Sequence, residues 1–271
     1  MYLNVHSQYS LRYGTMSVKS LVAEAALCGI KQMALTDINN STGIMEFMRE
    51  CDKAGIKPIG GIEFRRGRRL LYVGIARNKE GMKELNDFLT FHNLGQKELP
   101  DRPEIFKQAV IIYPYKGWSG GSLKGFEYLG IQHEDLHTLY GRNLEQTSGK
   151  LVLLQPVFVK DKVEYHLHEY LRAIDLNSLI TMVGSDDKCS GTGVFLTPRE
   201  LEARFDKYCF ILENTRRLME GCVMDYKRGK VRLNRQTFTG SRDDDRKLLE
   251  KLALAGLSQR YGKQHKDARK K

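Results

Sequence analysis

The sequence lacks the long apolar runs and the paired cysteines that mark several classes of protein. No stretch approaches the roughly 18 uncharged apolar residues that a membrane-spanning helix needs. The first residues carry no basic segment followed by an apolar one, so we expect no secretory signal peptide. The five cysteines are scattered without a CxxC motif, which argues against disulfides and cysteine-rich zinc sites. These absences predict a soluble cytoplasmic protein with no membrane partner.

Glycine-rich and nucleophile motifs of common enzyme classes are also missing. The glycines at 60–61 and 117–121 fit neither the GxGxxG dinucleotide motif nor the Walker phosphate loop. Ser119 and Ser122 do not stand in a GxSxG nucleophile elbow. The sequence therefore gives no support for nucleotide-dependent or serine-hydrolase chemistry.

One pattern typical of zinc proteases is present, but in a poor context. His133, Glu134 and His137 match HExxH, in which two histidines one helical turn apart bind zinc and the glutamate acts as a base. The glycines at 130 and 141 leave room for only a short helix, and no third histidine follows at the usual spacing. We therefore expect a short surface helix here, with its histidines facing solvent.

A second histidine pair lies in a helix-like segment farther along the chain. His166 and His168 are two residues apart, which sends them to different faces of a helix and prevents them from sharing a metal ion. Leu167, Leu171 and Ile174 have the spacing of a buried helix face. This segment is predicted to be a packing helix.

The positive charge of the chain is concentrated at its C-terminal end. The formal net charge is +11, and residues 227–271 hold 15 Lys and Arg against 5 Asp and Glu, whereas the rest hold 29 and 28. A basic tail can bind nucleic acid. The tail side chains expected to do so are Lys266, Arg269, Lys270 and Lys271. The alternative is a solvated end, or the end of a piece of a longer protein.

Short β-branched runs alternate with amphipathic stretches along most of the chain. We predict strands at 2–6, 32–36, 57–62, 70–76, 109–113 and 151–159. Helices are predicted at 18–28, 42–54, 80–90 and 163–175, after Pro198, after Tyr208, and from Ser241 to about residue 261. Residues 114–149 show no clear pattern. This order predicts parallel strands joined by right-handed crossovers, in a barrel or an open wound sheet.

Three polar residues follow the first three predicted strands. His6, Asp37 and Glu63 stand where those strands end, and in barrels and wound sheets the chemistry is placed at the carboxyl ends of the strands. The three side chains could converge on a metal ion or a phosphate. The alternative is that strand ends are polar only because loops begin there.

Several segments in one order resemble a known family. They are VHSQYSL at 5–11, MALTD at 33–37, AGIKPIGGIEF at 54–64, ARNKEG at 76–81, HEYLRAI at 168–174 and LENT at 212–215. Together they resemble the polymerase-and-histidinol-phosphatase (PHP) family, and within it the domain at the N-terminus of bacterial DNA polymerase III alpha subunits. The resemblance implies an α/β fold, a distorted seven-stranded TIM-like (β/α) barrel, over residues 1–235. Residues 236–271 would be a basic amphipathic helix and tail leading toward a polymerase palm.

Active members of that family bind metal ions and hydrolyse phosphoesters, but most of the ligand positions are changed here. The resemblance carries metal-site positions onto His6, Asp37 and Glu63, whereas the ligands are replaced at Asn4, Tyr13, Ile38 and Leu71. Tyr, Ile and Leu offer no lone pair suited to a hard cation, and the two retained ligands, His6 and Glu63, cannot fix even a tetrahedral metal. We therefore expect no metal and no catalytic residue in this domain, with apolar side chains refilling the site.

The resemblance thus implies a scaffold and interaction domain of a replicative DNA polymerase. Its partners would be the palm and thumb of the same parent chain, the proofreading exonuclease subunit that some family members carry, and DNA through the parent. No cofactor is expected in this domain, and Mg²⁺ is expected in the parent. Two alternatives stay open: a free-standing phosphoesterase with a reduced metal site around His6 and Glu63, and a nucleic-acid-binding module acting through the tail.

Overall fold

Two compact units make up the chain, Met1–Asp225 and Tyr226–Lys271. The computed structural model describes residues 1–116, 118, 121–142, 144, 147–184, 187–188, 193–225 and 237–262. The first unit holds the sheet and the helices through α6, and the second holds α7 (Arg242–Tyr261). The predicted domain boundary at 235 lies outside the described residues.

The N-terminal elements follow the predicted alternation closely. They are β1 (Tyr2–Val5), α1 (Val18–Leu27), β2 (Gln32–Leu35), α2 (Ile44–Ala54) and β3 (Lys57–Arg66). Ser17 caps α1 by accepting a hydrogen bond from the Ser20 amide, and Gly55 ends α2 in the left-handed conformation that glycine adopts without a steric penalty. The three strands pair in parallel, as the alternating pattern predicts.

The eight-stranded sheet has the order β7-β6-β5-β4-β3-β2-β1-β8. Its other strands are β4 (Arg69–Ala76), β5 (Ala109–Pro114), β6 (Glu127–Ile131), β7 (Leu151–Leu153) and β8 (Pro156–Val157). The prediction of parallel strands throughout is wrong for β4, which pairs antiparallel with both β3 and β5. Only Gly67 and Arg68 separate β3 from β4, and so short a connection makes a hairpin, since a parallel pair needs a long crossover.

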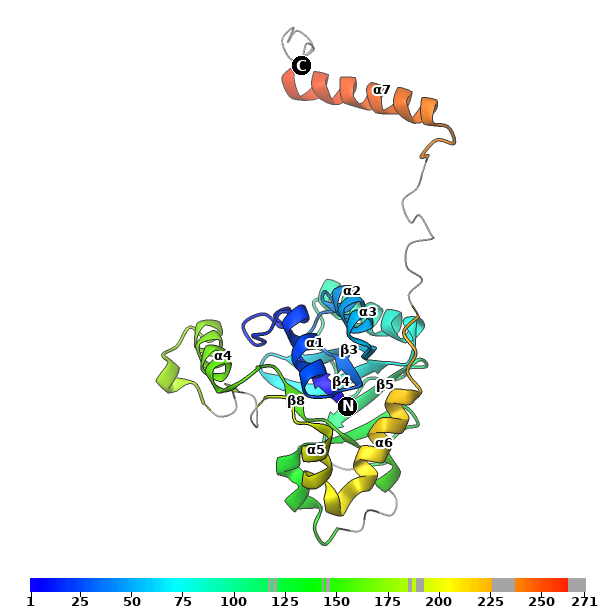
Figure 1. Cartoon of the computed structure of the whole chain (residues 1–271). Helices are drawn as coiled ribbons and strands as arrows, with labels where there is room; N and C mark the ends of the chain where they lie inside the picture. Colours follow the sequence, from blue (N-terminus) through cyan, green and yellow to red (C-terminus); the bar gives the residue numbers. More distant parts are fainter. Residues whose placement is uncertain are drawn as a thin grey trace. The chain divides into compact units, whose positions relative to one another are not determined.

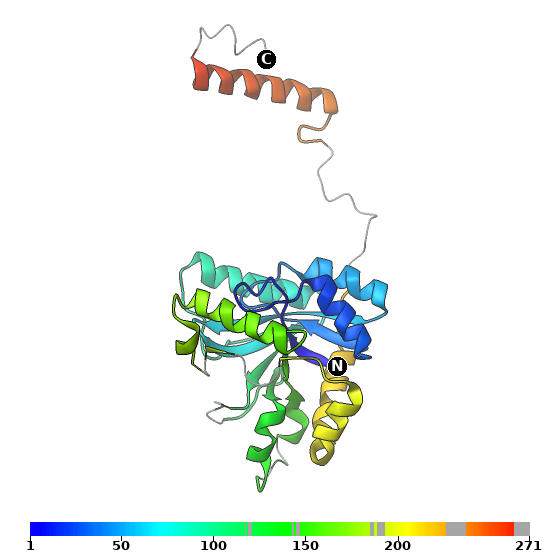
Figure 2. The same cartoon turned by 60° about the vertical axis from the view of Figure 1, so that its left-hand side comes forward.

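The run predicted as one strand over 151–159 forms two short strands on opposite edges of the sheet. Only Leu154 and Gln155 separate β7 from β8, so the two edges lie within about 10 Å of each other. The sheet must therefore curl so that its two edges approach each other at this crossing, and Figures 1 and 2 show the curled sheet. This confirms the predicted barrel-like α/β fold, with eight strands rather than seven.

Aliphatic side chains from nearly every strand fill the interior of the curled sheet. The cluster includes Leu3, Ala34, Ile59, Val73, Val110 and Val152, all buried. The remaining helices are α3 (Lys79–Leu94), α4 (Lys162–Asp175), α5 (Pro198–Arg204) and α6 (Cys209–Glu220). Helix α3 packs against β3, β4 and β5, whereas α6 packs against β7 (Figure 2). The apolar interior leaves polar chemistry to the ends of the strands.

Helix α4 packs in a way that its sequence does not predict. Leu167 and Ile174, expected on the buried face, are 47% and 64% exposed, whereas His168 and Arg172 are buried. Arg172 donates from Nε to the Asp187 carbonyl and from Nη1 to the Asp175 carboxylate. The helix therefore docks through hydrogen-bonding side chains, which offset the loss of apolar burial.

Candidate functional site

The carboxyl ends of β1, β2 and β3 bring together the three polar residues that follow these strands. His6, Asp37 and Glu63 are all buried. His6 Nε2 lies 3.2 Å from Glu63 Oε2, and the two form an ion pair when the ring is protonated. His6 Nδ1 lies 3.3 Å from Ser10 Oγ, which donates to Asp37 at 2.7 Å. The predicted convergence of the three side chains is thus present.

Asp37 is bound on both carboxylate oxygens by the loop that follows β1. Oδ1 accepts from the Ser7 amide at 2.7 Å and from the Ser10 hydroxyl at 2.7 Å, and Oδ2 accepts from the Ser7 hydroxyl at 2.8 Å. The Ile38 amide donates back to Ser10 Oγ. The carboxylate therefore ties the loop to β2, and its lone pairs are engaged within the protein.

Nitrogen atoms of neighbouring side chains contact both carboxylate oxygens of Glu63. Oε1 accepts from Arg65 Nε, and Oε2 accepts from Asn4 Nδ2 at 3.0 Å and lies beside His6. Burial raises the pKa of Glu63, but the charges and hydrogen bonds of Arg65 and His6 outweigh it and lower the pKa to about 2. The acid is therefore fully ionised at neutral pH without any metal ion.

Arg65 is the central residue that the sequence analysis missed. It stands two residues after Glu63 on β3, so the period of a strand places both side chains on the same face. Asn39 holds its backbone by accepting from the Arg65 amide and donating to the Arg65 carbonyl. The guanidinium is 4.4 Å from the centroid of the Tyr13 ring, and the Arg65 side chain is 13% exposed. The signal available in the sequence was a cation two residues from a strand-end acid.

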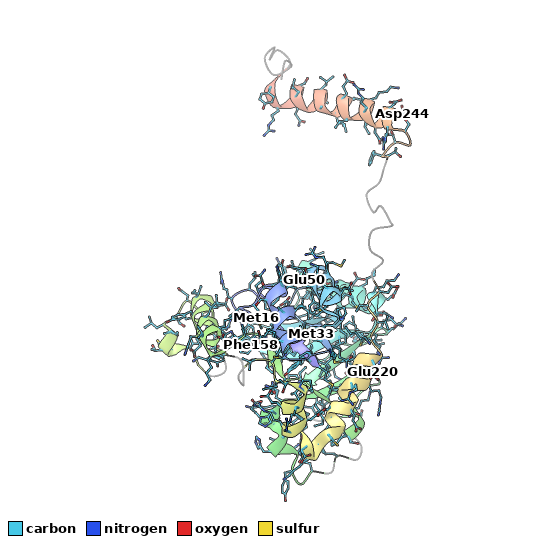
Figure 3. All side chains as sticks on the ribbon, in the orientation of Figure 1. Met16, Met33, Glu50, Phe158, Glu220 and Asp244 are labelled. Atoms are coloured by element: carbon cyan, nitrogen blue, oxygen red, sulfur yellow. The ribbon has the colours of Figure 1, made fainter. Side chains whose placement is uncertain are left out.

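An aromatic cluster closes the other side of His6. The Tyr13 ring meets the rings of His6 and His168 edge to face at 5.3 and 4.8 Å, and Phe158 lies 4.4 Å from His168. His168 Nδ1 is 2.7 Å from the Tyr13 carbonyl. Burial lowers the pKa of His168 to about 4 and keeps the ring neutral at pH 7. Figure 3 labels Phe158, between the barrel and α4.

The four positions expected to have lost metal ligands have different surroundings. Asn4 and Tyr13 are buried beside Glu63 and Arg65. Ile38 is half-buried and packs with Tyr13 and Phe158. Leu71 is a buried residue of β4.

The residues at the strand ends do not fit the metal cluster that the family resemblance implies. The Asp37 and Glu63 oxygens are engaged by protein donors, and a guanidinium already supplies a positive charge beside Glu63. Across the described part of the chain, no group of three or more His, Cys, Asp or Glu side chains could hold a metal ion. The arrangement can hold an internal ion pair but offers no set of free ligands.

The histidines of the other motifs do not join this site, although Glu134 lines the cavity at this end of the barrel. His133, Glu134 and His137 lie in a 3₁₀ helix, η1 (His133–Leu139), whose three-residue turn places side chains four apart on different faces. His137 Nδ1 contacts the Glu134 carbonyl. His166 is exposed and pairs with Glu169, on a different face from the buried His168. The expectation that the two histidines of α4 face apart is confirmed.

The predicted tail contacts cannot be placed on the structure. Lys266, Arg269, Lys270 and Lys271 lie outside the described residues. In the described part of the chain no helix is both long enough and apolar enough to span a bilayer.

A cavity of about 340 Å³ opens beside Glu63 and Arg65, at the carboxyl ends of the parallel strands. Most of the other cations that line it are paired with acids: Arg68 with Asp187, Arg69 with Asp101, and Lys188 with Glu169. The mouth of the barrel is therefore a mixed-charge surface in which salt bridges neutralise most of the positive charge.

Comparison with known proteins points in one direction. The family described as "PHP domain" matches residues 3–152, more than half of the chain. The error-prone DNA polymerase of Symbiobacterium thermophilum is 38% identical over 97 residues, which cover 36% of this chain and 9% of that protein. The DNA polymerase III subunit alpha of Halalkalibacterium halodurans is 25% identical over 305 residues, which cover 97% of this chain and 26% of that protein. The DNA polymerase III subunit alpha of Borreliella burgdorferi is 44% identical over 154 residues, which cover 55% of this chain and 12% of that protein. The chain thus spans about a quarter or less of the length of these relatives.

Proposed function

The chain belongs to the PHP domain family, and we propose that it is the N-terminal scaffold and interaction domain of a replicative DNA polymerase III alpha subunit. The similarity to alpha subunits over 97% of this chain supports that parentage. In this proposal, DNA synthesis and its Mg²⁺ ions belong to parts of the parent outside residues 1–271. DNA synthesis by the parent takes place in the cytoplasm. The domain contacts the palm and thumb of the parent and its proofreading exonuclease subunit.

The observation that carries the scaffold role is the pairing of Glu63 with Arg65. In a metal-dependent phosphoesterase, the metal neutralises phosphoryl oxygens and activates water. Here the positive charge beside Glu63 belongs to the chain itself, and its guanidinium occupies Oε1, an oxygen that a metal ion would otherwise bind. Tyr13 lies over this guanidinium, with the ring centroid 4.4 Å from it. Glu63 therefore acts as a structural acid that joins β3 to β1.

The test combines metal analysis with a phosphoesterase assay on the full chain. After incubation with Zn²⁺ or Mn²⁺ and dialysis, we expect well below one metal ion per chain. We also expect no turnover of phosphomonoester or phosphodiester substrates that depends on Glu63. Stoichiometric metal, together with turnover that Glu63→Ala abolishes, would contradict the proposal and establish the free-standing phosphoesterase instead.

Parentage has a separate test. We expect the reading frame to continue beyond Lys271 into a polymerase domain with the acidic residues that bind the two metals of nucleotide addition. A stop codon directly after Lys271 would contradict the proposed parent. Because this test does not involve the strand ends, it can fail while the metal analysis holds.

A further inference from the structure

A second cavity lies at the opposite end of the barrel from Glu63. It has a volume of about 230 Å³, and its lining includes Arg77, Tyr128, Arg217 and Cys222. Tyr128 is the second residue of β6, and Arg77 directly follows β4, which runs antiparallel to β5. The cavity therefore opens at the amino ends of β5 and β6, beside the C-terminal end of α6, where Figure 3 labels Glu220.

The charged side chains that line this cavity are all positive. Its nine lining residues include two arginines and no Asp or Glu. In the described part of the chain, neither Arg77 nor Arg217 forms an ion pair, although Glu213 and Glu220 lie on the same helix as Arg217. This contrasts with the mouth of the barrel, where acids neutralise most of the cations.

A third cation stands beside the cavity. Lys150 lies over the Tyr128 ring, with Nζ 4.5 Å from the ring centroid. Burial lowers the pKa of Lys150, and the charge of Arg77 lowers it further, whereas the charge of Glu127 raises it. Asn214 fixes the turn before Lys150 by donating from Nδ2 to the Ser148 and Leu151 carbonyls. The cations are thus held near one another, and the nearby carboxylate of Glu127 is itself paired with Arg102.

The dipole of α6 does not account for this cluster. Arg217 lies in the last turn of α6, where a cation complements the C-terminal carbonyls. Lys57 already serves that end, because its Nζ donates to the Met219 and Glu220 carbonyls at 2.9 and 3.0 Å. Arg77 belongs to no helix, and its backbone is held by the Gln108 carbonyl and the Val223 amide. Both arginines are exposed, so their unpaired guanidinium groups are accessible to a ligand from solvent.

We propose that Arg77 and Arg217, supported by Lys150, form a binding site for a phosphate group at the end of the barrel opposite Glu63. Guanidinium groups recognise phosphate through paired, charge-assisted hydrogen bonds. The volume of about 230 Å³ is below that of typical cofactor pockets, so the site takes a phosphoryl group rather than a whole nucleotide. The same chemistry could be presented by a free phosphate, a mononucleotide or the phosphorylated end of a nucleic-acid strand.

The test is a calorimetric titration of the full chain with inorganic phosphate, with chloride at matched ionic strength as the control. We expect saturable binding to phosphate but not to chloride. Arg77→Gln and Arg217→Gln should each weaken the affinity at least about tenfold, because each removes charged hydrogen bonds. The matched control is Arg199→Gln, an exposed arginine on α5, which should leave the affinity within about twofold.

A second readout keeps the test independent of small stability changes. In NMR spectra of the arginine side chains, phosphate should shift the Nε signals of Arg77 and Arg217 but not that of Arg199. AMP and a 5′-phosphorylated oligonucleotide, compared with its 5′-hydroxyl form, then identify which phosphate source binds most tightly. Absence of saturable binding, an equal response to chloride, or an equal loss in Arg199→Gln would overturn the proposal.

Discussion

At the residue scale, the strand-end acid and its neighbouring guanidinium determine the character of the barrel mouth. Glu63 is fully buried, and a buried carboxylate is tolerated only when donors compensate for its lost hydration. Arg65, Asn4 and His6 supply that compensation. The same three contacts stabilise the fold and occupy the oxygens of Glu63.

We predict that Glu63→Gln makes the free energy of unfolding depend less steeply on pH in acid. The folded pKa of Glu63 is about 2, below the unfolded value near 4.5, so its contribution is complete above pH 4.5 and is lost as the pH falls toward 2. The shift corresponds to about 3 kcal/mol at neutral pH. The variant should be less stable by roughly this amount at pH 7, with a shallower slope between pH 4.5 and 2. Urea unfolding across that range measures it.

The matched control for this measurement is Glu202→Gln, at an exposed position on α5. Its curve should run parallel to that of the wild type. If the Glu63→Gln curve is also parallel, Glu63 does not have the depressed pKa that its contacts imply.

His168→Asn should remove the pH dependence of stability in a different range, between pH 6.5 and 4. The folded pKa of His168 is about 4 against an ordinary value of 6.5, so the unfolded chain takes up this proton first, and stability is lost as the pH falls from 6.5 toward 4. The variant should lose this slope, while its amide can still donate to the Tyr13 carbonyl. Thermal unfolding between pH 7 and 4 measures the effect. His166→Asn on the exposed face is the control, and an equal loss of slope there would refute the assignment.

At the element scale, α4 shows how polar anchoring can override an apolar pattern. Its start and end agree with prediction to within one residue, because Asp161 caps the first turn and the segment favours a helix. Its orientation does not agree, because the backbone carbonyls of Tyr13 and Asp187 offer acceptors to His168 and Arg172. Such acceptors come from distant loops, so the helix sequence alone carries no sign of them.

We predict that Arg172→Met destabilises the protein by about 2 to 4 kcal/mol, because carbonyl and carboxylate groups lose a buried charged donor. Ile174→Ser, on the exposed apolar face of the same helix, should change stability by no more than about 0.5 kcal/mol. Chemical denaturation of both variants measures the difference. The reverse order would mean that the apolar face, and not the polar one, is buried.

At the scale of the whole molecule, the curl of the sheet depends on a short crossing between its two edges. Leu154 and Gln155 connect β7 on one edge to β8 on the other. A Cβ atom added to Gly130 on β6 would lie 2.4–2.9 Å from the Leu154 side chain. Close approach at this glycine lets the crossing residue pack inside the curled sheet.

Gly130→Ala should therefore cost about 1 to 3 kcal/mol through overpacking. Gly125→Ala, where an added Cβ meets no atom within 4 Å, is the matched control and should be near neutral. Differential scanning calorimetry of the two variants measures the effect. Equal melting temperatures would show that the Leu154 side chain can move enough to accommodate the added methyl group.

The sequence by itself determined most of the elements and the strand-end position of His6, Asp37 and Glu63, since local periodicity and caps act over a few residues. The periodicity left a barrel or an open wound sheet open, and the family resemblance implied the barrel. Only the tertiary structure decided the antiparallel β4, the divided run at 151–159 and the outward apolar face of α4. It also decided that Arg65 pairs with Glu63 and that Arg77, Lys150 and Arg217 gather at one cavity. These depend on contacts between segments far apart in the chain, whose energies no local pattern records.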